Sequence, residues 1–225
     1  MTFSGLDNPI WFALTSAHRE FSDGDEVARR YLKAYAPFIA VREPTDEAGE
    51  RLLSLVDVGE RVGILGVMPE MEAGWSLVKQ IDLFQYEWRE PFAELWDEDV
   101  VALTCEDIPA MLELTALVYP AYFREETAAL GQYFGIYDGD RLCGMAGVRM
   151  TLTGYREISA VCTHPDYRGR GIASRLSKHL VTFIQEQGDV PFLHTEFDNV
   201  AAQAVYERLG MTKRRVIPFR VVDRV

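Results

Sequence analysis

The chain carries the sequence ISAVCTHPDYRGRGIASRL at residues 158–176. The first six residues are mostly small or β-branched, which is typical of a buried strand. Pro165 and Asp166 end that strand. Apolar residues recur at helical spacing from Ile172 onward, and Gly188 predicts where that helix ends. The segment is therefore predicted to be a strand, a glycine-rich turn and a helix.

The turn carries two glycines, Gly169 and Gly171, interleaved with Arg168 and Arg170. The start of a helix has four backbone N–H groups without a partner and the positive end of the helix dipole. Glycine lets the main chain approach a ligand closely and adopt φ values that other residues avoid. Since the arginines add positive charge, the turn predicts a site for a phosphate or a pyrophosphate.

The spacing of the glycines narrows the choice of ligand. A P-loop requires a lysine after its glycines, and none follows here. A dinucleotide fingerprint requires a third small residue, which here falls one place short, because Ala173 is followed by Ser174. An RGG-type RNA-binding tract is repeated and disordered, whereas this one is single and lies in a periodic context. A solvated loop is the remaining alternative.

The pattern that fits is R-x-x-G-x-A, from Arg168 through Gly171 to Ala173. It resembles the acetyl-CoA signature of the GNAT superfamily of N-acetyltransferases, [Q/R]-x-x-G-x-[G/A]. The resemblance implies an α/β (α+β) fold with a mixed central sheet that is splayed at the strand holding acetyl-CoA. Residues 97–225 match the family's element order, β-α-α-β-β-β-α-β-α-β, with residues 121–130 as a loop or the second helix.

The first 96 residues are predicted to form a smaller α/β domain, with residues 97–225 as the acetyltransferase domain. We expect helices over residues 27–35 and 46–56, and strands over 38–41, 61–67 and 77–88. This arrangement resembles the degenerate N-terminal half of glycine N-acyltransferase-like proteins. The alternative is an extension that only covers the sheet.

Composition limits the partners. The formal net charge of −12 argues against a nucleic acid or a membrane surface. The three cysteines form no metal-binding or disulfide pattern, so we expect no metal. The chain shows no apolar run long enough for a membrane span and no signal peptide. We therefore expect a cytoplasmic monomer or homodimer.

The resemblance also implies which residues bind acetyl-CoA, the expected co-substrate. The strand is expected to pair with the pantetheine arm, residues 168–173 to bind the pyrophosphate, and the run that begins at Phe197 to reach the cofactor through Asn199 and to place Tyr206 near the sulfur. The residues at these positions are Val161, Cys162, Thr163, Arg168, Gly169, Arg170, Gly171, Ile172, Ala173, Asn199 and Tyr206.

Transfer to an amine requires a group that accepts a proton and stabilisation of the leaving thiolate. Glu157 is the candidate base, with Glu196, His164 and His194 as alternatives. Tyr206 matches a family tyrosine that can serve as general acid; otherwise it is a core aromatic. Cys162 is not expected to be a nucleophile.

The aromatic residues divide between pocket and core. Tyr119, Tyr122 and Phe123 are candidate acceptor contacts, and Trp75, Tyr86 and Trp88 are predicted to pack in the core or face a pocket. The predicted function is transfer of an acetyl group from acetyl-CoA to a primary amine of a small molecule or peptide, by direct attack. The alternative is a catalytically silent acyl-CoA-binding regulatory protein.

Overall fold

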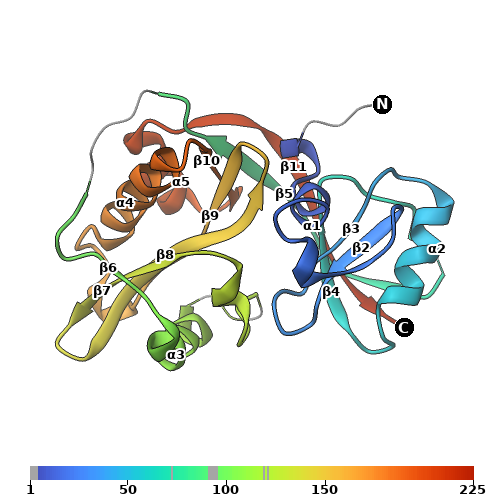
Figure 1. Ribbon diagram of the computed structural model, residues 1–225, viewed down its shortest axis with the longest axis horizontal. Helices are drawn as coiled ribbons and strands as arrows, with labels where there is room; N and C mark the ends of the chain where they lie inside the picture. Colours follow the sequence, from blue (N-terminus) through green and yellow to red (C-terminus); the bar gives the residue numbers. More distant parts are fainter. Residues whose placement is uncertain (1–4, 72, 91–95, 119, 121) are drawn as a thin grey trace.

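The computed structural model describes residues 5–71, 73–90, 96–118, 120 and 122–225. Its helices are α1 (Pro9–Leu14), α2 (Asp46–Leu55), α3 (Ile108–Val118), α4 (Ile172–Glu186) and α5 (Val200–Leu209). Its strands are β1 (Ser22–Gly24), β2 (Ala28–Tyr31), β3 (Ile39–Val41), β4 (Arg61–Leu65), β5 (Trp75–Glu87), β6 (Val101–Ala102), β7 (Tyr133–Asp138), β8 (Arg141–Leu152), β9 (Tyr155–Thr163), β10 (Val190–Glu196) and β11 (Thr212–Arg224). Figure 1 shows their arrangement.

The strands form two sheets. The large sheet has eight strands in the order β4-β11-β5-β10-β9-β8-β7-β6, and the small one has the order β1-β2-β3. From β6 onward the elements follow the predicted order. The predicted loop or second helix is a short 3-10 helix, Thr127–Leu130.

The large sheet opens between β9 and β10, which confirms the expected splay. These two strands run parallel and pair only from Val190–Tyr155 to Phe192–Glu157, although β9 continues to Thr163. On its other side β9 pairs with β8 through a bulge, where Ala160 has a φ of +51°. A positive φ is uncommon for alanine and marks a local distortion of the strand. Beyond Glu157, the edge of β9 that faces β10 is therefore open.

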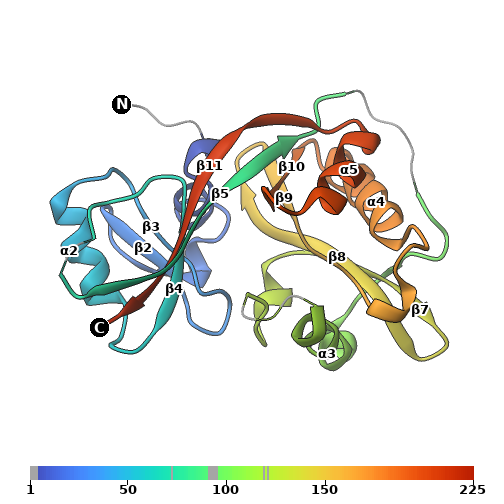
Figure 2. The ribbon, with the colours of Figure 1, turned by 180° about the vertical axis from the view of Figure 1, so that it is seen from behind.

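The N-terminal residues share this sheet. β5 lies between β11 and β10, and β4 pairs with the other edge of β11. Figure 2 shows β5 and β11 running side by side across the middle of the molecule, from near the C-terminus toward α5. Residues 1–96 and 97–225 therefore contribute strands to one continuous sheet.

The predicted helix over residues 27–35 is wrong, because residues 28–31 form β2. The Asp25 carboxylate accepts hydrogen bonds from the N–H groups of Val27 and Ala28, at 2.8 and 3.1 Å. An aspartate makes such bonds both at a helix start and in an Asx turn, so the sequence signal is ambiguous. The predicted helix over 46–56 is confirmed as α2, whose N-cap Thr45 accepts a hydrogen bond from the Ala48 N–H.

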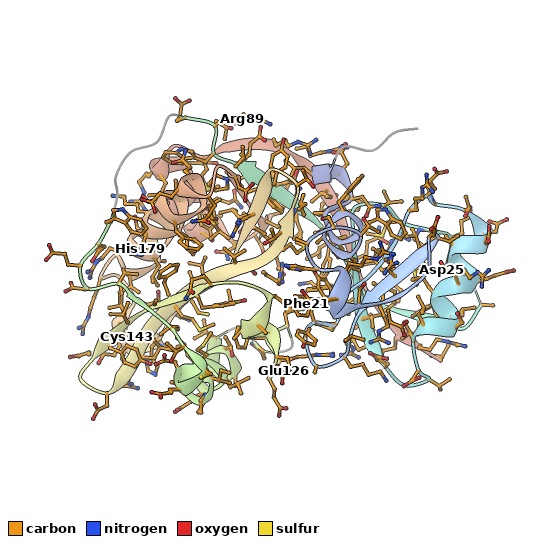
Figure 3. All side chains as sticks on the ribbon, in the orientation of Figure 1. Phe21, Asp25, Arg89, Glu126, Cys143 and His179 are labelled. Carbon is orange, nitrogen blue, oxygen red and sulfur yellow. The ribbon has the colours of Figure 1, made fainter. Side chains whose placement is uncertain are left out.

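The core lies on both faces of the large sheet. One face packs against the apolar side of α4, which contributes Leu176, Leu180 and Ile184. His179, labelled in Figure 3, lies on the same side of α4, with its ring centroid 4.6 Å from that of Phe134. The opposite face is covered by α1 and α3. The open edge of β9 thus lies in a sheet that is packed on both faces.

Candidate active site

The glycine-rich turn has the backbone geometry of an anion site. Gly169 and Gly171 both have a φ of +78°, and Gly171 is the N-cap of α4. The N–H of Arg175 donates to the carbonyl of Gly171 at 3.0 Å, so the amides of residues 172–174 have no acceptor one turn earlier in the helix. A Cβ atom added to either glycine would meet nothing within 4 Å. The turn has both the donors and the room for a diphosphate.

The arginines around the turn differ in their partners. Arg168 and Arg170 are exposed, and neither pairs with a carboxylate among the described residues. Arg175 instead makes two hydrogen bonds of 2.6 Å to Asp97 and one to Asp99, and these carboxylates raise its pKa. Positive charge for a bound anion therefore comes from Arg168 and Arg170, whereas Arg175 holds the chain before β6 against α4.

Successive side chains of β9 point to opposite faces of the sheet. Val161 and Thr163 are half-buried, whereas Cys162 is buried with its thiol donating to the carbonyl of Ala160 at 3.0 Å. Burial raises the pKa of the Cys162 thiol to about 12, so the group stays protonated at neutral pH. Cys162 therefore has no thiolate for nucleophilic attack, and on the side of β8 it is paired with Met145.

A cavity of about 290 Å³ occupies the splay between β9 and β10. It brings together predicted residues from three segments of the chain. They are Glu157, Val161, His194, Glu196, Asn199 and Tyr206. Residues of the N-terminal segment close its other end.

Glu157 stands at the last residue pair between β9 and β10 and is 1% exposed. Both of its carboxylate oxygens accept hydrogen bonds from Arg149, from Nε and Nη2 at 2.9 Å each. His194 Nδ1 lies 2.8 Å from Glu157 Oε1. Burial by itself would raise the pKa of Glu157, but the Arg149 charge and the His194 hydrogen bond outweigh it, and the pKa is lowered. The carboxylate is therefore ionised at neutral pH.

The tautomer of His194 follows from its second neighbour, Gln85 on β5. The Gln85 Oε1 accepts from Arg214 Nη1 at 2.7 Å, and its Nε2 donates to the Leu6 carbonyl at 2.8 Å. These bonds fix the orientation of the amide. The same Nε2 lies 2.9 Å from His194 Nε2, which must therefore accept. His194 thus carries its proton on Nδ1 and donates it toward Glu157.

Tyr206 and Asn199 come from the helix that follows β10. Tyr206 is 7% exposed, with its ring centroid 6.0 Å from that of Tyr86, and it lines the cavity. Asn199 caps α5, because its Oδ1 accepts from the Ala202 N–H at 3.1 Å. Tyr206 is thus both a packed aromatic and a cavity residue.

The alternative bases have other partners. His164 Nδ1 accepts from the Asp166 N–H at 3.2 Å, and its Nε2 lies 2.7 Å from Arg141 Nη2, so it stabilises the turn after β9. Glu196 borders the cavity but forms an ion pair of 2.9 Å with Lys79.

The aromatic residues predicted as acceptor contacts or core residues also lie in different places, some at the cavity and others in the core. Tyr119 lies outside the described residues, and Tyr122 lines the cavity. Phe123 packs against Tyr133 instead, with ring centroids 5.5 Å apart. Trp75, Tyr86 and Trp88 are buried in the core and do not line the cavity.

Several cavity residues were not found from sequence. Arg149 is the only charged residue in the run LCGMAGVRM, residues 142–150, and that isolation was a usable signal. Phe38 and Phe219 gave no signal, because an aromatic in a strand pattern most often packs in a core.

The described residues show neither a metal-binding cluster nor a membrane-spanning helix. Within the described part of the chain, no three His, Cys, Asp or Glu side chains cluster so that they could hold a metal ion. No described helix has both the length and the apolar composition needed to cross a bilayer.

Comparison with known proteins identifies the family. The model of the acetyltransferase (GNAT) family matches residues 75–211, which is more than half of the chain. The chain belongs to the GNAT family of acetyltransferases. A GNAT enzyme uses acetyl-CoA as co-substrate, in agreement with the turn and the splay described above.

The chain is similar to two N-alpha-acetyltransferases and to a GNAT-family acetyltransferase of known structure. The chain is 33% identical over 123 residues to N-alpha-acetyltransferase RimI of Mycobacterium tuberculosis, covering 50% of this chain and 77% of that one. It is 28% identical over 117 residues to N-alpha-acetyltransferase MAK3 of Arabidopsis thaliana, covering 52% and 60%. A GNAT-family acetyltransferase structure from Novosphingobium aromaticivorans superposes with a TM-score of 0.91 at 31% identity, covering 99% of this chain and 100% of that chain. The N-terminal segment therefore occurs in a GNAT relative of known structure.

Proposed function

We propose that this GNAT acetyltransferase transfers an acetyl group from acetyl-CoA to a primary amine of a small molecule or peptide, by direct attack of the amine. The observation that carries the proposal is the cavity at the splay, which holds an ionised carboxylate and a tyrosine beside the open edge of β9. The names of the two N-alpha-acetyltransferase relatives support an amine as acceptor.

The open edge and the turn supply the binding groups for acetyl-CoA, which brings the acetyl thioester. Among the described residues no strand pairs with the main chain of Val161 and Thr163 on the side of the splay, so these groups can pair with an amide-containing chain. Residues 168–173 present backbone amides and two arginines to the diphosphate. Asn199 lines the cavity at the start of α5 and contributes a further polar contact.

Glu157 is proposed as the proton acceptor, through a water molecule. Its lowered pKa makes it a weak base toward a free ammonium, so the amine must arrive neutral. Once the nitrogen has bonded to the carbonyl carbon, its protons are far more acidic, and an ionised carboxylate can accept one. Arg149 and His194 hold that carboxylate in place.

Tyr206 is proposed as the proton donor. When the nitrogen bonds to the carbonyl carbon, the C=O π electron pair moves onto oxygen. The C–S bond breaks when the carbonyl re-forms, and the electron pair of the C–S bond leaves on sulfur. The Tyr206 hydroxyl gives its proton to that thiolate, while Glu157 holds the proton lost by the amine. Tyr206 lines the same cavity as Glu157.

Steady-state acetylation of a panel of primary amines tests the proposal. The intact enzyme should acetylate at least one of them, and Tyr206→Phe should lower kcat by roughly 10²-fold with little change in the Kd for acetyl-CoA. If the intact enzyme binds acetyl-CoA and acetylates no amine, the proposal fails.

A second proposal concerns residues 1–96. We infer that they form a degenerate half of the kind found in glycine N-acyltransferase-like proteins. The support is a small sheet with α2 beside it, which lacks a glycine-rich phosphate turn of its own.

A further inference from the structure

The end of the cavity away from the turn is walled by three aromatic rings. Phe38 and Tyr122 stack with their ring centroids 5.9 Å apart and their planes within 5° of parallel. Phe219 meets both rings edge-on, with centroids 6.4 Å from Phe38 and 6.1 Å from Tyr122. Ile10 and Leu65 complete this wall. The residues of this wall belong to the N-terminal segment, to the loop before residue 127 and to β11.

The wall is fixed in place by the backbone behind it. Gly63 on β4 donates its N–H to the carbonyl of Pro37 at 2.7 Å, which holds the peptide next to Phe38. A Cβ atom added to Gly63 would lie 2.9 Å from the Phe219 ring and 3.1 Å from the Phe38 ring. The two rings therefore pack directly on a glycine backbone and present a preformed surface.

The charged groups around the cavity are paired with one another. Arg149 is held by Glu157, and its guanidinium lies over the Phe38 ring at 4.8 Å. Lys79 and Glu196 form an ion pair at the exposed rim. A second charge on the acceptor close to its amine would have to break one of these pairs or enter the cavity unpaired, and either costs free energy.

We propose that the acceptor is a primary amine attached to an aromatic or large apolar group, with no second charge beside it. The apolar group packs on Phe38, Tyr122 and Phe219, which directs the amine toward the carboxylate of Glu157. The free energy of burying that group against a preformed wall supplies the selectivity. This inference rests on the proposed function and specifies its acceptor.

Competition between amines tests the inference. Values of kcat/KM are measured with acetyl-CoA for 2-phenylethylamine, ethanolamine and spermidine, and for short peptides that begin with leucine, serine or aspartate. We expect 2-phenylethylamine to exceed ethanolamine and spermidine by at least about tenfold. The peptide arm shows whether the apolar amine belongs to a small molecule or to the first residue of a peptide, where leucine should exceed serine and aspartate.

Variants connect the selectivity to the wall. Phe38→Leu should lower kcat/KM for 2-phenylethylamine about tenfold, with the KM for acetyl-CoA unchanged within twofold. Phe21→Leu is the matched control, because Phe21 packs on Tyr35 in the same segment and does not line the cavity. Tyr122→Leu is a second wall variant at a half-buried position, should Phe38→Leu fail to fold.

The outcomes separate the two proposals. Preference for spermidine or ethanolamine, or an unchanged preference in both wall variants, overturns the inference while the acetyltransferase function stands. Acetylation of no amine overturns the proposed function and this inference together.

Discussion

Glu157 on β9 accepts a hydrogen bond from His194 Nδ1 on β10 at 2.8 Å, at the point where backbone pairing between these strands ends. The last backbone pair joins Phe192 to Glu157, and His194 is the next residue of β10 that faces the same way. A side-chain bond thus takes over from the backbone ladder at the mouth of the splay. The site and the opening of the sheet are consequently parts of one structural feature.

Glu157→Gln should lower both stability and activity. It leaves the Arg149 charge buried and without its carboxylate, which costs about 3–5 kcal/mol in the free energy of unfolding. The double variant Arg149→Met/Glu157→Gln removes both charges and should regain much of that stability, as measured by urea unfolding. Acetylation should stay low in both variants, since neither has a proton acceptor at position 157. Recovery of activity along with stability in the double variant would show that Glu157 has only a structural role.

Gly171→Ala should weaken acetyl-CoA binding at least about tenfold, because its Cβ would intrude where the anion approaches the start of α4. Gly188→Ala is a matched control at the other end of the same helix. Both glycines have a φ of +78° and open space where a Cβ would stand, so the backbone strain is the same. Titration calorimetry should show the loss for Gly171→Ala alone. An equal effect of the two substitutions would mean that strain, not the site, is responsible.

A fragment of residues 97–225 should not fold. Strand β11 pairs with β4 and β5 and with no other strand among the described residues, and both lie before residue 97. The fragment also lacks Gln85, which orients His194. Circular dichroism should show no cooperative thermal transition for the fragment and one for the intact chain. A fragment that melts cooperatively near the Tm of the intact chain would establish residues 97–225 as an independent domain.

The stability of the fold should fall as the pH drops from 7.5 to 5. His18 is 3% exposed, and burial lowers its pKa from 6.5 to about 4. The unfolded chain therefore binds a proton in this window that the folded chain does not, so stability is complete above pH 6.5 and declines below it. The expected loss is about 2 kcal/mol. His18→Gln keeps a polar partner for Tyr31, and urea unfolding at the two pH values should show that loss removed. A variant that loses as much stability as the intact protein would exclude His18 as the cause.

The fold of the C-terminal half was predictable because its signals are local. The strand, the two glycines and the periodic helix after Ile172 are contiguous in sequence, and each has few alternative conformations. The helix over residues 27–35 was mispredicted, since Asp25 carries a signal common to a helix cap and a turn. The insertion of β5 between β10 and β11 had no local signal, because partner choice in a sheet depends on distant residues.

The candidate site, like the fold, was predicted from the sequence only in part. Glu157, Tyr206 and the turn were named from the family pattern, and the structure gathers Glu157 and Tyr206 at one cavity, which residues 168–173 do not line. Of the aromatic wall only Tyr122 was named from the sequence, since Phe38 and Phe219 are 181 positions apart and come into contact only in the folded chain, where both rings pack on Gly63 of β4. Pairings of this kind arise from packing, which sequence periodicity does not encode.

A crystal structure with acetyl-CoA tests the central claim most directly. We predict the diphosphate on the backbone amides of residues 169–173, the pantetheine arm paired with β9 at Val161 and Thr163, and the thioester in the cavity between Glu157 and Tyr206. Acetyl-CoA bound elsewhere, or bound at the turn with its thioester outside this cavity, would contradict the account.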